Sequence, residues 1–96
     1  MLTYRAPLRD IHFVLDELLD APAHYARLQG CEEVAPDLLA AIIDSGAKFA
    51  ENVAAPLNAI GDEQGCKFDN GKVITPPGFK EAFQQYGAAG WSALGI

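Results

Sequence analysis

The sequence has no long apolar run. Its longest strongly apolar stretch, Leu38 to Ile43, has six residues, whereas a helix needs roughly 20 apolar residues to cross a bilayer. The N-terminus carries Arg5 and Arg9 on either side of Pro7 and lacks the uninterrupted apolar segment of a secretory signal. We therefore expect no membrane span and a cytoplasmic location.

Basic residues are scarce. The chain has seven Lys and Arg and 13 Asp and Glu, which gives a formal net charge of −6. The basic residues are scattered along the sequence. Binding to a phosphate backbone needs clustered cations. The composition therefore argues against nucleic-acid binding and equally against an anionic membrane surface.

Cysteine is rare as well. Cys31 and Cys66 are far apart, with neither Cys-x-x-Cys spacing nor a histidine at ligand spacing. A zinc site is therefore not expected. In a cytosolic setting, reduced thiols are strongly favoured over a disulfide.

The motifs of catalysis are missing too. His12 and His24 have no nucleophile or carboxylate at a spacing that implies a triad. No Gly-x-Gly-x-x-Gly follows a strand, and the paired carboxylates fall near turns or on polar faces. We expect no catalytic, cofactor-binding or metal-binding residue in this chain.

What the chain does contain is amphipathic helix. Apolar residues at helical spacing predict a helix from Pro7 to Leu19, and a short helix over Ala23–Leu28 follows. Phe13 lies on the opposite, polar face of the first helix. Either it is a single exposed aromatic residue or a second surface covers it.

The clearest pattern predicts a helix from Pro36 to Ile60. Pro56 removes the hydrogen bond to the carbonyl of Asn52 and costs on the order of 3 kcal/mol in a straight helix. We therefore expect a kink between Asn52 and Pro56, or two helices that meet there.

The last third of the chain predicts a hairpin and another helix. Asn70-Gly71 between two short extended runs is typical of a tight β-hairpin. Thr75 is a plausible cap for the helix that follows, and Gly87 and Gly90 would end it. The final seven residues carry no charge, so we expect a neighbouring domain to cover Trp91, with stacking on a ligand as the weaker alternative.

Three ordered strings resemble one branch of the acyl-CoA dehydrogenase family. Together they cover nearly the whole chain: Tyr4-Arg5-Ala6-Pro7-Leu8-Arg9-Asp10-Ile11-His12-Phe13-Val14-Leu15-Asp16-Glu17-Leu18-Leu19; Phe49-Ala50-Glu51-Asn52-Val53-Ala54-Ala55-Pro56-Leu57-Asn58 with Gly61-Asp62 and Gly65-Cys66; and Asn70-Gly71-Lys72-Val73-Ile74-Thr75-Pro76-Pro77-Gly78-Phe79-Lys80-Glu81-Ala82 with Gly90-Trp91.

The resemblance implies a larger enzyme of fatty acid metabolism with a helical N-terminal domain, a middle β-domain and a C-terminal helical bundle. Such enzymes oxidise the α–β carbon bond of an acyl-CoA thioester, with a glutamate base and FAD, and pass electrons to electron-transfer flavoprotein. The base and most flavin contacts of the family lie in the middle and C-terminal parts. No FAD is expected on this segment alone.

The expected fold class is therefore mainly α, with several amphipathic helices and one short β-hairpin, as an incomplete N-terminal helical domain of this family. Residues 1–34 would form an N-terminal extension and residues 35–96 part of the helical domain. Phe13 and Trp91 are the candidates for contact with the remaining domains or with another subunit of a homo-oligomer. The alternative is a stand-alone helical module that binds a partner protein.

Overall fold

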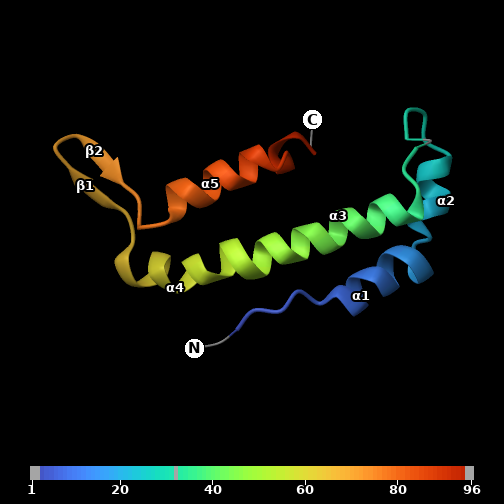
Figure 1. Ribbon diagram of the computed structural model, residues 1–96, viewed down its shortest axis with the longest axis horizontal. Coiled ribbons are helices and arrows are strands. Elements are labelled where there is room, and N and C mark those ends of the chain that lie inside the picture. The colour runs from blue at the N-terminus through green and yellow to red at the C-terminus, as the bar shows by residue number, and fades with distance from the viewer. Residues whose placement is uncertain (1–2, 32, 95–96) are drawn as a thin grey trace. The chain divides into compact units, whose positions relative to one another are not determined.

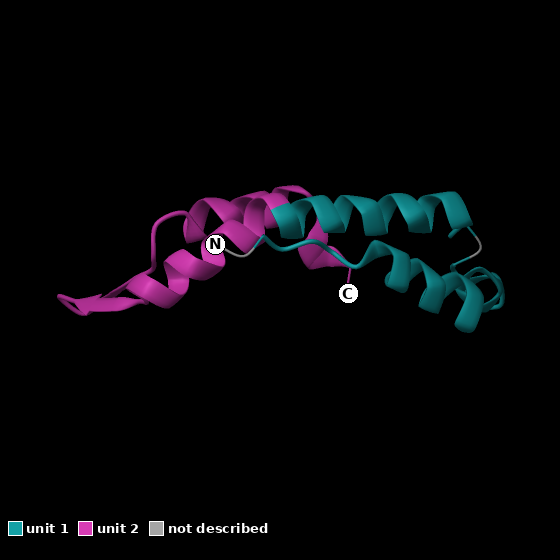
Figure 2. Ribbon diagram, turned by 90° about the horizontal axis from the view of Figure 1, so that it is seen from below, with its two compact units in different colours: residues 1–51 teal, residues 52–96 magenta. Residues whose placement is uncertain are grey.

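The computed structural model describes residues 3–31 and 33–94 (Figure 1). The chain divides into two compact units, residues 1–51 and 52–96 (Figure 2). Helices predominate in both, and the second unit also carries a two-stranded sheet. The expected mainly α fold with one hairpin is confirmed. The proposed boundary between an extension, 1–34, and a helical domain, 35–96, stays a prediction.

The first unit begins with an extended segment and then a helix. Helix α1 (Leu8–His12) continues as a π-helical stretch, η1 (Phe13–Leu18). The helix predicted from Pro7 to Leu19 is therefore present, although its second half is wider than an α-helix. Figures 1 and 2 both show α1 beside helix α3 (Pro36–Phe49).

Helix α2 (Ala21–Ala26) starts two residues earlier than expected and also ends two residues earlier. The reason is Asp20, which adopts φ 47° and accepts a hydrogen bond from the Ala23 backbone N–H at 3.4 Å. Asp is a preferred N-cap residue, and proline is well tolerated in the first turn that follows. Pro22 therefore lies within the first turn of α2.

The long helix predicted from Pro36 is formed by α3, the π-helical stretch η2 (Ala50–Ala54) and helix α4 (Ala55–Gln64). The irregularity expected near Pro56 is present as this π stretch, which ends two residues before the proline. A π turn shifts the hydrogen-bond register and so accommodates the missing N–H. The expected end at Ile60 is wrong, because the helix continues through Gly61 and ends before Gly65, whose φ is 62°.

The predicted hairpin is confirmed. Strands β1 (Lys67–Asp69) and β2 (Lys72–Ile74) pair antiparallel, with Phe68 opposite Val73. The turn residues Asn70 and Gly71 both have positive φ, 49° and 76°. Two successive positive φ values match the right-handed twist of the flanking strands, which explains why Asn-Gly occurs here.

Helix α5 (Phe79–Ala88) follows the hairpin. Its N-cap is Gly78 at φ 88°, so the expectation that Thr75 caps this helix is wrong. Pro76 and Pro77 therefore precede the helix, and the backbone turns at Gly78 before helical geometry begins. Gly87, which was expected to end this helix, lies within it. After Gly90, at φ 87°, a short 3-10 turn spans Trp91–Ala93. The expected covering of Gly95 and Ile96 lies outside the described residues.

Few side chains are enclosed. Among the described apolar residues, Ala21 and Ala47 are buried, at 6% and 7% exposure. Large apolar side chains on both units stay open, including Leu18 at 67%, Phe68 at 77% and Phe83 at 74%. The described helices therefore cover little of their own apolar surface.

Candidate functional site

The N-terminal segment is attached to the long helix at two polar points. The Ala6 backbone N–H donates to Glu51 Oε1 at 3.0 Å. Further along the same N-terminal segment, His12 Nε2 lies 3.4 Å from Asp44 Oδ1. Both contacts are inside the first unit and join segments more than 30 residues apart in sequence.

Asp44, Ala47 and Glu51 explain why the attachment lies where it does. Positions three and four apart adjoin on a helix surface. Ala47 is buried and small, so the neighbouring segment can approach closely between the two carboxylates. Sequence reasoning placed Asp44 and Glu51 on the polar, solvated face. Their spacing of seven residues with an alanine between them was the available signal for a docking face.

His12 also faces a carboxylate of its own helical segment. Its Nδ1 lies 3.8 Å from Asp16 Oδ2, and the imidazole is 31% exposed while both carboxylates are 54% exposed. This histidine thus lies between two acidic groups from η1 and α3. Neither acid was predicted as its partner from the sequence.

The first interface candidate, Phe13, is exposed. Its side chain is 54% accessible. It lines an open hollow of about 480 Å³ whose other walls are charged or titratable side chains, namely Arg9, His12, Asp16 and Glu17. The structure therefore puts Phe13 on the polar face, as expected. What contacts Phe13 stays a prediction.

The second interface candidate, Trp91, is half-buried at the start of the 3-10 turn in the second unit. Leu94, one turn further on, is 63% exposed. The covering of Trp91 by another domain stays a prediction.

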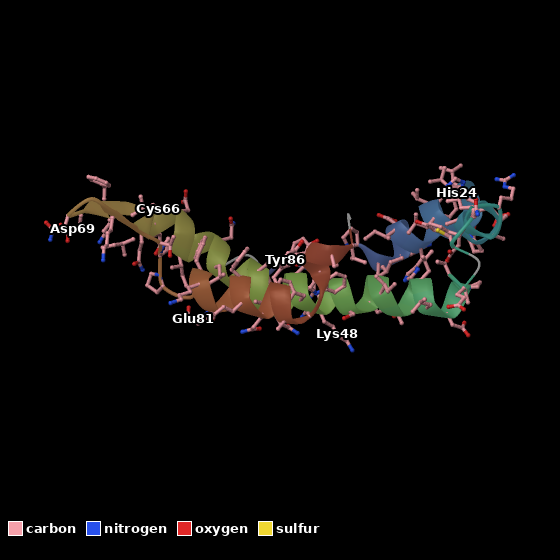
Figure 3. All side chains as sticks on the ribbon, turned by 90° about the horizontal axis from the view of Figure 1, so that it is seen from above. His24, Lys48, Cys66, Asp69, Glu81 and Tyr86 are labelled. Carbon is pink, nitrogen blue, oxygen red and sulfur yellow. The ribbon has the colours of Figure 1, made fainter. Side chains whose placement is uncertain are left out.

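The second unit has an open hollow of about 400 Å³ at the junction of α4, the hairpin and α5. Its walls combine apolar side chains with one carboxylate, one amide and one thiol: Leu57, Asn58, Gly61, Asp62, Gly65, Cys66, Pro76 and Phe79. Figure 3 shows Cys66 at the end of α4. No cation lines this hollow, and Asp62 would repel a phosphate group. These residues do not fit the diphosphate of a flavin dinucleotide.

The hollow lies where α4 and the start of α5 approach closely. Two glycines allow this approach because they have no side chain. A Cβ on Gly61 would lie 2.8 Å from Phe79 Cζ, and one on Gly78 would lie 2.8 Å from Leu57 Cδ2. Phe79 therefore packs its ring against helix backbone. The sequence predicted Phe79 on the apolar stripe of its helix but not the glycine that receives it.

One face of the hairpin is apolar and uncovered. Phe68 and Val73 are paired across the strands, so their side chains lie on the same face of the sheet. They are 77% and 67% exposed. A two-stranded hairpin is marginally stable without such a face being covered.

Within residues 3–31 and 33–94, no three His, Cys, Asp or Glu side chains come together as metal ligands. Cys31 and Cys66 are both free thiols. In the same part of the chain, no helix is both long and apolar enough to span a bilayer.

Comparison with known proteins extends the resemblance. No family model matches the chain. Over 93 residues, 97% of its length, the chain is 38% identical to 3-methylmercaptopropionyl-CoA dehydrogenase from Ruegeria pomeroyi (strain ATCC 700808 / DSM 15171 / DSS-3). The chain spans only 16% of the length of that relative. The match confirms the resemblance to an acyl-CoA dehydrogenase over nearly all of this chain.

Proposed function

We propose that this chain is the N-terminal structural part of an FAD-dependent acyl-CoA dehydrogenase. The observation that carries the proposal is the 38% identity, which extends over 97% of this chain but only 16% of the relative. A similarity that is nearly complete on one side and partial on the other is what a segment of a longer enzyme produces.

In this proposal the segment contributes packing surface. Its described residues leave Phe13, Phe68 and Phe83 more than half exposed. Exposed large apolar side chains are the kind of surface from which interaction sites are built. The surfaces on each unit would contact the remaining domains of the enzyme or a second subunit of a homo-oligomer.

The reaction of the whole protein would be oxidation of the α–β carbon bond of an acyl-CoA thioester. The name of the relative identifies its own substrate as 3-methylmercaptopropionyl-CoA, and we propose an acyl-CoA thioester as the substrate class here. The hollow in the second unit does not fit a dinucleotide, and we propose that residues outside this chain hold FAD. Electron-transfer flavoprotein would be the acceptor, and the location would be cytoplasmic.

The test begins with the reading frame that carries this sequence. We expect the codons after Ile96 to encode a β-domain followed by a helical bundle. The protein made from the whole frame should co-purify with a flavin absorbance and bleach when an acyl-CoA is added without oxygen. A frame that stops after Ile96, or a whole protein without flavin, would overturn the proposal.

The 96-residue chain purified by itself serves as the matched control. We expect it to emerge from gel filtration without flavin absorbance, even after incubation with excess FAD. A yellow preparation of this short chain would show that the flavin site had been assigned to the wrong part of the protein.

A further inference from the structure

We propose that protonation of His12 strengthens the attachment of the N-terminal segment to helix α3. The segment is then held more tightly at pH 6 than at pH 8. The inference concerns the first unit alone and does not rest on the proposed enzymatic function.

The geometry of the imidazole carries the inference. His12 Nε2 faces Asp44 Oδ1 at 3.4 Å, and His12 Nδ1 faces Asp16 Oδ2 at 3.8 Å. A neutral imidazole has one N–H, whereas an imidazolium donates from both nitrogens. Only the protonated ring can therefore present a donor to both carboxylates at once.

The two carboxylates come from different segments, which makes this contact a link. Asp16 lies in η1, within the same helical run as His12, whereas Asp44 lies 32 residues away on α3. Protonation of His12 adds an electrostatic attraction between the ring and Asp44. At the same time, the attraction to Asp16 holds the ring in its orientation. The added attraction holds α1 against α3.

Other charged groups near the ring do not reverse this sign. Arg9 and Glu17 line the same open hollow as His12, and they carry opposite charges. On α3, Lys48 lies one turn beyond Asp44, and Figure 3 shows it on the side of the helix away from α1. Among the described residues, the carboxylates within 4.0 Å of the imidazole nitrogens are those of Asp16 and Asp44.

A second contact of the same segment involves no histidine, since the Ala6 N–H donates a hydrogen bond to Glu51 Oε1. An unperturbed imidazole has a pKa of about 6.5. Imidazole is therefore the kind of side chain whose charge changes between pH 8 and 6. The segment is thus attached at one point through a carboxylate and a backbone N–H, and at another through an imidazole.

The test is peptide-resolved hydrogen exchange of the intact polypeptide that carries this sequence, at pH 8 and pH 6, with exchange times scaled to the intrinsic rates. We expect protection of residues 8–18 to rise roughly two- to fivefold at pH 6, the range that exposed ion pairs supply. High salt should reduce the rise, because these groups are partly exposed.

Matched variants decide the assignment. The rise should disappear in His12→Gln and in the isosteric Asp44→Asn. It should persist in His24→Gln, which removes the other histidine of the chain, an exposed residue that stacks edge-on against Tyr25. Protection of α5 peptides serves as the internal reference for folding in each variant.

A rise that survives in either His12→Gln or Asp44→Asn would overturn the proposal, as would a rise lost only in His24→Gln. If His12→Gln lowers protection of the first unit at both pH values, that variant has disturbed folding. The presence or absence of the rise in Asp44→Asn then decides the test. Loss of flavin or of dehydrogenase activity bears only on the proposed function, so the two proposals fail separately.

Discussion

Phe79 Cζ lies 2.8 Å from the position that a Cβ on Gly61 would occupy. The ring of the first residue of α5 thus rests against the backbone of α4, where any side chain would displace it. This contact and the matching one between Gly78 and Leu57 set how closely the two helices approach.

Gly61→Ala should therefore destabilise the second unit. Overpacking costs about 1–3 kcal/mol, which outweighs the roughly 0.5–1 kcal/mol that alanine gains over glycine in a helix. Gly87→Ala is the matched control, because Gly87 is helical and nothing lies within 4 Å of its added Cβ. Urea unfolding should show a lower midpoint for the first variant and a higher one for the second.

The same contact predicts a rescue. Phe79→Leu shortens the side chain that meets Gly61, so the double variant should lose less stability than the sum of the two single variants. Additive losses in the double-mutant cycle would mean that the ring and the added methyl group do not meet.

The hairpin turn supplies a second prediction. Gly71→Val should weaken the hairpin by about 1–2 kcal/mol, because a side chain at φ 76° is strained. Asn70→Gly keeps a residue that tolerates positive φ and should preserve the pairing. The cross-strand contact between Phe68 and Val73, observed by NMR, should weaken in the first variant and persist in the second.

Glu51 supplies a third. Glu51→Ala removes the acceptor of the Ala6 N–H, and a hydrogen bond to a charged group contributes about 1.5–3 kcal/mol at most when well shielded. Since this hydrogen bond is only part-buried, we expect Glu51→Ala to lower the free energy of unfolding by about 1 kcal/mol. The Ala6 amide should also exchange faster. Glu63→Ala, at an exposed position on α4, should leave that amide unchanged.

The interface candidates supply a fourth. In the whole protein, Phe13→Ser should lower stability by about 1.5–3 kcal/mol if the proposed packing buries this ring. In the 96-residue chain, where the ring is 54% exposed, the change should stay within about 0.5 kcal/mol. Equal effects in the two proteins would argue against an interface at Phe13.

The fluorescence of Trp91 tests the proposed contact with another domain independently, because Trp91 is the one tryptophan of the chain. Trp91→Phe identifies its share of the fluorescence in the whole protein. That share should be blue-shifted relative to the short chain if another domain covers the indole. Emission typical of a water-exposed indole in the whole protein would exclude the contact.

Local sequence determined most of the elements. Apolar spacing located α1 and the long helix, Asn70-Gly71 fixed the hairpin, and Pro56 marked the irregular stretch before it. Each of these signals acts through a few neighbouring residues, by backbone sterics or by the period of one helix face. The same locality explains the error at Thr75, because Gly78 offered the backbone a turn nearer to the helix.

Only the tertiary structure decided which side chains meet. Asp44 and Glu51 looked like solvated acids, and nothing near them in sequence indicates His12 or Ala6 as partners. Gly61 likewise lies just beyond the helix end expected at Ile60, and nothing near it in sequence indicates that Phe79 packs against it. Contacts between residues 18 to 45 positions apart depend on how whole segments pack, and that packing is settled by the summed burial and polar pairing of many residues together rather than by any short pattern.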